Sequence, residues 1–219
     1  MLPKGFLFDF DGVVVNSFKS HFSAGGSAFK ELFNVDIAPY PKSLVVVAPI
    51  KIAAYFCGLV NQPQKAEDLF LLKDKHLDIY FTTPEILPGV PEITSFLTAQ
   101  NIPYGIASNA TRLFIKNCIE KLNLNFETYF GVEDYEKPKP APEAYITLAK
   151  SLGFTEKDFK NIWVFEDSLT GTTAAKLAGM QPIGILTQYS EEELKKAGST
   201  LTFPTLLEAY NYLQTSNKS

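Results

Sequence analysis

The sequence predicts an α/β fold in which a Rossmann-like parallel sheet is covered by helices on both faces and carries an inserted, all-helical cap domain. Three observations lead to this prediction. Short apolar runs that end in polar residues recur along the chain, helical patterns lie between them, and residues 17–84 depart from this alternation. Strands that alternate with helices form parallel sheets, because each helical crossover packs on one face of the sheet.

Five apolar runs have the pattern of buried strands. The first covers residues 5–10 and is followed by Gly12, as expected for a buried strand that enters a turn. The other four lead into polar residues or prolines in the same way and cover residues 104–107, 129–132, 162–165 and 183–186. These five strands would form the sheet.

Four helices are expected between and after these strands, at residues 111–122, 142–152, 190–197 and 204–213. Pro142 suits the first position of its helix, and Ser190 forms a capping-box pattern with Glu193. The threonine-rich segment 170–173 is expected to open a further helix.

Residues 17–84 predict a helical cap that is inserted directly after the first strand. Four phenylalanines of this segment fall on one helical face, namely Phe18, Phe22, Phe29 and Phe33. No clear strand pattern lies within it, and the prolines between residues 84 and 91 mark the return to the core. We therefore predict a catalytic core of residues 1–16 and 85–219 and a cap of residues 17–84, with hinges near residues 16–17 and 83–88.

Composition excludes several classes of function. The 219 residues are 46% hydrophobic and 20% charged, as in globular proteins that bury a core. A net charge of −4 offers no basic surface, so we expect neither nucleic acid nor an anionic membrane as a partner. Cys57 and Cys118 lie far apart and outside any CxxC pair, which argues against a disulfide scaffold or a zinc site. We expect a cytoplasmic monomer.

Two apolar segments have features that argue against membrane targeting. Near the N-terminus, Asp9 and Asp11 interrupt the apolar stretch too early for a signal peptide. Residues 44–60 are largely apolar but contain Pro49 and Lys51, and they are shorter than a comfortable membrane span. They predict a buried or capping helix.

Polar residues with useful chemistry follow the predicted strands. Open parallel sheets bind ligands at the carboxyl ends of their strands. Residues from distant parts of the chain can therefore converge at that edge. The expected set is Asp9, Asp11, Ser108, Asn109, Lys139, Glu166 and Asp167.

The spacing of the first two acids suits transfer of a phosphoryl group. Asp9 and Asp11 project to the same side of an extended chain, and Asp9 can attack phosphorus as a carboxylate nucleophile. Its repulsion from a phosphate dianion costs several kcal/mol at an effective dielectric constant of about 20. Mg²⁺ would remove this repulsion, with Glu166 and Asp167 as further carboxylates. Asp11 can protonate the leaving oxygen and then deprotonate the attacking water.

Four motifs occur in order over nearly the whole chain. They are Asp-Phe-Asp-Gly-Val-Val from Asp9, Ser108-Asn109, Lys-Pro-Ala-Pro-Glu from Lys139, and Val-Phe-Glu-Asp-Ser ending at Ser168. Together they resemble the haloacid dehalogenase superfamily of phosphotransferases, in the branch that contains β-phosphoglucomutase and small phosphatases with a helical cap.

The resemblance implies a role for each matching residue. Asp9 would be the nucleophile and Asp11 the acid/base. Mg²⁺ would be held by Asp9, the Asp11 carbonyl group, Glu166 and Asp167. The phosphoryl oxygens would be bound by Gly12, Ser108, Asn109 and Lys139.

Two departures from this branch bear on the reaction. Asn16 stands where many members have aspartate. The mutases carry a glycine- and arginine-bearing loop early in the cap, whereas residues 39–49 contain neither residue type. Arg112 is the only arginine of the chain, so the predicted cap lacks the usual group for a bidentate grip on a second phosphate.

We therefore predict a Mg²⁺-dependent phosphatase that acts on a small phosphorylated metabolite such as a sugar phosphate. A sugar phosphomutase is the main alternative, since lysines of the cap could replace arginine. A phospho-acceptor signalling domain or a non-catalytic relative is a third. For His21, Lys75 and His76 in the cap, and for Arg112 near the core site, contact with substrate and a purely structural role are both open.

Overall fold

The computed structural model describes residues 2–37, 49–79 and 83–216, and the chain divides into two compact units. The larger unit comprises Met1–Asn16 and Glu85–Ser219, and the smaller comprises Ser17–Pro84. Each unit is described by itself.

The larger unit is built on a six-stranded sheet in which every neighbouring pair of strands is parallel. The strand order is β5-β4-β1-β6-β7-β8. These strands are β1 (Gly5–Phe8), β4 (Tyr104–Ala107), β5 (Tyr129–Phe130), β6 (Ile162–Glu166), β7 (Gln181–Ile185) and β8 (Leu201–Phe203).

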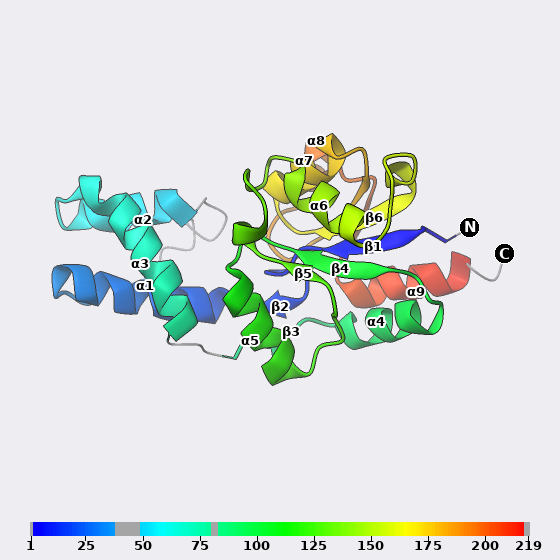
Figure 1. The fold of residues 1–219 in the computed structure, drawn as a ribbon. Coiled ribbons are helices and arrows are strands. Elements are labelled where there is room, and N and C mark those ends of the chain that lie inside the picture. Colours follow the sequence, from blue (N-terminus) through cyan, green and yellow to red (C-terminus); the bar gives the residue numbers. More distant parts are fainter. Residues whose placement is uncertain (1, 38–48, 80–82, 217–219) are drawn as a thin grey trace. The chain divides into compact units, whose positions relative to one another are not determined.

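Helices cover both faces of this sheet (Figure 1). One face carries α6 (Glu143–Ser151), α7 (Leu169–Leu177) and α8 (Glu191–Ala197). The other carries α4 (Val90–Ala99), α5 (Arg112–Leu122) and α9 (Leu206–Ser216). Two 3₁₀ turns, η3 (Val132–Asp134) and η4 (Phe159–Asn161), lie in the connections. This arrangement confirms the predicted Rossmann-like α/β core.

Aromatic side chains anchor the middle of the sheet. All four residues of β1 are buried, as expected for a strand that helices cover on both sides. Phe6 stacks on Phe165 of β6 with ring centroids 6.0 Å apart, and Phe8 lies 5.1 Å from the same ring. Burial of large aromatic rings is a major stabilising contribution, so the strand that precedes Asp9 is firmly held.

The register of the sheet brings three strand ends together. Phe8 lies opposite Ile106 of β4 and Phe165 of β6. The next backbone N–H, that of Asp9, donates to the Phe165 carbonyl oxygen at 2.9 Å. Because β4 and β6 flank β1 on opposite sides, this edge is also the point where the strand order reverses, which is where open α/β sheets bind ligands.

Several elements were not predicted from the sequence. The strand β8 is short and only half-buried, and α4 begins after Gly89, whose φ of 94° places it in the left-handed region. By contrast, the helix expected at the threonine-rich segment is present as α7, which begins at Leu169 and has Ser168 rather than a threonine as its N-cap. A two-stranded antiparallel sheet joins β2 (Val15–Asn16) to β3 (Glu85–Ile86). Strands of two residues are too short to produce a hydrophobic period.

The smaller unit is helical in the residues that the structure describes. It contains α1 (Phe18–Phe33), α2 (Pro49–Leu59), η2 (Pro63–Lys65) and α3 (Ala66–Ile79). Phe29 is buried and lies 4.7 Å from Phe33 and 6.2 Å from Phe56 between ring centroids, whereas Phe18 is exposed. The role of residues 17–84 as a cap over the catalytic site remains a prediction.

The apolar segment 44–60 contributes the 11-residue helix α2. Among the residues that the structure describes, no helix is both long and apolar enough to cross a membrane. Most of the segment 39–49, on which the comparison with the mutase loop depends, lies outside the described residues.

Candidate active site

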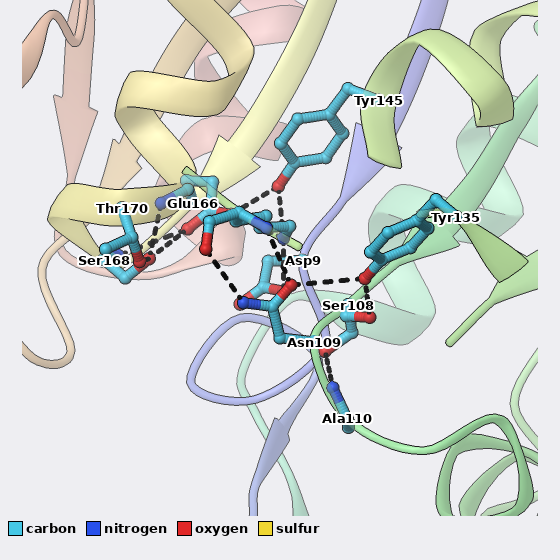
Figure 2. Close-up of polar contacts among 11 residues, drawn as sticks. Asp9, Ser108, Asn109, Ala110, Tyr135, Tyr145, Glu166, Ser168 and Thr170 are labelled. Atoms are coloured by element: carbon cyan, nitrogen blue, oxygen red, sulfur yellow. Dashed lines mark hydrogen bonds and ion pairs between the residues drawn. The ribbon is translucent and has the colours of Figure 1, made fainter. Parts of the chain in front are cut away.

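Five of the residues predicted for the site are buried where the strands end. Asp9 follows β1, Ser108 follows β4, and Glu166 is the last residue of β6. Asp167 comes next, and Lys139 reaches the same place from the loop that precedes α6. All five are at most 8% exposed. Figure 2 shows the polar contacts around Asp9, Ser108 and Glu166.

The Lys139 ammonium group lies at the centre of the contacts. Its Nζ atom donates to Asp9 Oδ1 and to Glu166 Oε1, each at 2.7 Å. The Tyr145 hydroxyl oxygen also lies 2.7 Å from Nζ, and this hydroxyl donates to Glu166 Oε1. Burial alone would lower the pKa of Lys139, but the charges of Asp9 and Glu166 together outweigh it and raise the pKa. The lysine is therefore a fixed positive charge beside the predicted nucleophile.

Asn109 holds the backbone of Lys139. Its Oδ1 atom accepts from the Lys139 backbone N–H at 3.1 Å, and its Nδ2 atom donates to the Lys139 carbonyl oxygen at 3.3 Å. The Tyr135 hydroxyl donates to the Ser108 carbonyl oxygen and lies 3.2 Å from Asn109 Oδ1. The contacts of Asn109 in the structure thus connect two motifs that are 30 residues apart.

Ser168 fixes the second oxygen of Glu166. Glu166 Oε2 accepts from the Ser168 hydroxyl group at 2.9 Å and from the Ser168 backbone N–H at 3.3 Å. The same hydroxyl oxygen caps α7 by accepting from the Gly171 N–H at 3.0 Å. A Cβ atom at Gly171 would lie 1.7 Å from Glu166 Oε1, so only glycine allows α7 to begin this close to the carboxylate.

Asp167 lies against the turn that follows β1. Gly12 in this turn has a φ of 78°, and a Cβ atom there would lie 1.8 Å from Asp167 Oδ2. Thr187 Oγ1 lies 2.6 Å from the Gly12 carbonyl oxygen and 3.0 Å from Asp167 Oδ2. Asp11 is partly exposed in the same turn, and its charge contributes to the electrostatic environment of Asp9.

Three carboxylates of the cluster suit a hard cation. Asp9, Glu166 and Asp167 each offer an oxygen, and these atoms lie within 4.8 Å of one another in a buried place. Burial, followed by repulsion from Glu166, raises the pKa of Asp9 to about 7, and burial with the charge of Asp9 raises the pKa of Asp167. Oxygen ligands and crowded negative charge are the setting in which proteins bind Mg²⁺, so these residues fit that ion.

We expect Mg²⁺ to raise the melting temperature more at about pH 8 than at about pH 5.5. The pKa of Asp9 in the folded chain, at about 7, lies above its value in the unfolded chain. The protonated side chain therefore stabilises the fold, and this stabilisation is lost as the pH rises through about 7. Mg²⁺ binds the deprotonated carboxylate and offsets this loss of stability. The increase in melting temperature that Mg²⁺ causes should therefore grow over the same pH range. Thermal melting with MgCl₂, and with NaCl at matched ionic strength, would test this. Equal stabilisation at both pH values would contradict it.

The structure shows partners for three of the four other predicted substrate contacts. The Arg112 guanidinium group donates to Asp134 Oδ1 at 2.6 Å and lies over the Tyr129 ring, 5.3 Å from its centroid. The remaining candidates belong to the smaller unit. His76 Nε2 lies 2.7 Å from Glu31 Oε2, His21 Nδ1 lies 3.5 Å from Lys73 Nζ, and Lys75 is exposed. Contact of these four residues with substrate remains a prediction.

Four residues of the site were not predicted from the sequence as members of it: Tyr135, Tyr145, Ser168 and Thr187. Tyr145 belongs to the apolar stripe of its helix, so the spacing of the apolar residues indicated only core packing. Ser168 precedes a helix and gave a signal that could have been used, since serine is a preferred N-cap.

Comparisons with known proteins agree with this geometry. Residues 6–185 match the family of haloacid dehalogenase-like hydrolases. The chain is 28% identical to the β-phosphoglucomutase of Bacillus subtilis over 193 residues, or 83% of each chain. It is 25% identical to (DL)-glycerol-3-phosphatase 2 of Arabidopsis thaliana over 185 residues, which cover 81% of this chain and 77% of that protein.

Many solved structures share the fold. A hydrolase from Pseudomonas syringae has a TM-score of 0.75 and 21% identity, with 96% of this chain and 98% of the other covered. A β-phosphoglucomutase from Clostridium difficile has a TM-score of 0.73 and 21% identity, with 98% and 96% covered.

Proposed function

Because the chain belongs to the haloacid dehalogenase-like hydrolases and is an enzyme of that family, we propose that it is a Mg²⁺-dependent phosphatase of a small phosphorylated metabolite such as a sugar phosphate. This membership confirms the resemblance predicted from the sequence. The observation that supports the proposal best is the buried Asp9 carboxylate, which is paired with Lys139 among two further acids.

In the proposed reaction, Asp9 accepts the phosphoryl group and then releases it to water. An Asp9 carboxylate oxygen attacks phosphorus, and the bond from phosphorus to the ester oxygen breaks while Asp11 protonates that oxygen. Asp11 then removes a proton from a water molecule that attacks the phospho-aspartate. The bond between Asp9 and phosphorus breaks, inorganic phosphate leaves, and both side chains return to their starting forms.

Charge is the main obstacle to the first step. Two unit negative charges about 4 Å apart repel by about 4 kcal/mol at an effective dielectric constant of about 20. Mg²⁺, held by Asp9, the Asp11 carbonyl group, Glu166 and Asp167, would neutralise charge on the phosphoryl oxygens. Lys139 adds a second positive charge beside Asp9. The hydroxyl group of Ser108 and the loop at Gly12 and Asn109 would orient the phosphoryl group.

A phosphomutase is the second candidate, since one relative is a β-phosphoglucomutase. A mutase must hold phosphate at both ends of a bisphosphorylated intermediate, and arginine is well suited to that grip. The only arginine of this chain donates to Asp134 at 2.6 Å, which favours hydrolysis.

We propose that residues 17–84 act as a cap that admits small substrates. A monomer in a reducing compartment, where the buried Cys57 and Cys118 stay as thiols, remains our expectation.

A screen of phosphorylated metabolites would test the function. We expect many turnovers of inorganic phosphate per protein with Mg²⁺, loss of activity with EDTA, and recovery when Mg²⁺ is restored. The screen should include β-glucose 1-phosphate with glucose 1,6-bisphosphate as primer, where formation of glucose 6-phosphate would instead identify a mutase. Labelling of the protein once, without turnover, would identify a phospho-acceptor domain. Full activity in EDTA would remove Mg²⁺ from the proposal.

A further inference from the structure

We propose that Tyr145 is a positioning residue, whose hydroxyl group fixes Lys139 and Glu166 relative to Asp9. The inference rests on the proposed function, because it concerns the same site. Tyr145 is completely buried on α6, among apolar residues that pack against the sheet. A buried hydroxyl group is costly unless it is hydrogen-bonded, and this one has two charged partners in the site.

The direction of the hydrogen bonds follows from the number of protons. The tyrosine hydroxyl has one proton, and the Glu166 carboxylate oxygen can only accept it. The hydroxyl oxygen must therefore accept from Lys139 Nζ, which lies 2.7 Å away. The result is a directed chain from the Lys139 ammonium group through the Tyr145 hydroxyl to Glu166.

This chain uses the full donor capacity of the lysine. An ammonium group has three N–H bonds, and Nζ has three oxygen partners at 2.7 Å, in Asp9, Glu166 and Tyr145. The same nitrogen lies 4.5 Å from the centroid of the Tyr145 ring, which adds attraction between the cation and the ring. Tyr145 is the neutral member of the three and sets the direction of the third N–H bond.

Glu166 is fixed in the same way. A carboxylate has about four acceptor positions. Oε1 accepts from Lys139 and Tyr145, and Oε2 accepts from the hydroxyl group and the backbone N–H of Ser168. Removal of the Tyr145 hydroxyl group would leave both a lysine donor and a glutamate acceptor without this partner in a buried place. Lys139 could then turn away from Asp9, and the Glu166 carboxylate could rotate.

The cost of this looser arrangement should appear in two measurements. Partners that hold the ligands of a metal typically contribute about 10- to 100-fold in metal affinity or activity. We expect Tyr145→Phe to weaken Mg²⁺ binding by about tenfold in calorimetry without substrate. At saturating Mg²⁺ it should lower kcat by about tenfold and leave KM within about twofold, because the lysine acts mainly in the transition state.

Tyr104→Phe is the matched control. Tyr104 lies on β4 of the same unit, and its hydroxyl group bonds to Thr98, away from the acids. This variant should keep Mg²⁺ affinity, kcat and KM within about twofold of the unmodified chain. Melting temperatures of both variants would show that they are folded. Mg²⁺ affinity and kcat of Tyr145→Phe that both match those of Tyr104→Phe would overturn the inference.

Calorimetry keeps this test separate from that of the proposed function. A chain that binds Mg²⁺ but hydrolyses no phosphate ester contradicts the function alone, and the tenfold change in Mg²⁺ affinity then still decides the role of Tyr145. A chain that hydrolyses esters while Tyr145→Phe changes neither quantity supports the function and overturns the role of Tyr145.

Discussion

Asp9→Asn should lower kcat by more than about a thousandfold without loss of folding. The amide keeps the size and shape of the side chain but cannot attack phosphorus as a carboxylate does. Lys139 would retain Glu166 as a charged partner at 2.7 Å. Since burial and repulsion raise the pKa of Asp9 to about 7, loss of this charge should leave the melting temperature at about pH 8 unchanged or higher.

The Asp9 prediction would be tested by phosphate release and by thermal melting of the same preparations. Asp158→Asn is the matched control, because Asp158 lies on the surface of the same unit and bonds to Lys4 at 2.6 Å. Its kcat should stay within about twofold of the unmodified chain. Retention of more than about a hundredth of the activity by Asp9→Asn would rule out the covalent mechanism.

Asp11→Asn should trap the phospho-aspartate. A substrate with a good leaving group, such as p-nitrophenyl phosphate, needs little help from an acid, so transfer to Asp9 should continue. Release requires a base that activates water, and loss of that base should slow it by about 10²- to 10⁴-fold. We expect a burst of about one p-nitrophenol per protein, followed by slow turnover. Intact-mass measurement should show one added phosphoryl group.

Two controls define the Asp11 experiment. The double variant Asp9→Asn with Asp11→Asn should give neither a burst nor an added phosphoryl group, because the acceptor is gone. Quenching at several times should show the added group appearing with the burst and decaying at the rate of slow turnover. If the phosphorylated chain never accumulates in Asp11→Asn, the role of Asp11 as the base is wrong.

Much of the core was predicted from the apolar runs of the sequence and from the polar residues at which these runs end. The buried run before Asp9 and the apolar run before Glu166 are local patterns, and the structure places both as central, adjacent strands. The same period could not reveal β8, which has three half-buried residues, nor the two-residue strands at Val15–Asn16 and Glu85–Ile86. Their pairing depends on the strands already in place rather than on their own composition.

By itself, the sequence determined the α/β class, the positions of five strands along the chain and the acids that follow them, because strand period and turn residues act over a few neighbouring positions. Only the tertiary structure decided how the charges are held. Tyr145 reads as a core residue until its hydroxyl group meets Glu166, 21 positions away, and Thr187 reaches the Gly12 carbonyl oxygen across 175 positions. Such contacts depend on how distant elements pack, and a buried polar atom needs a partner wherever the fold supplies one.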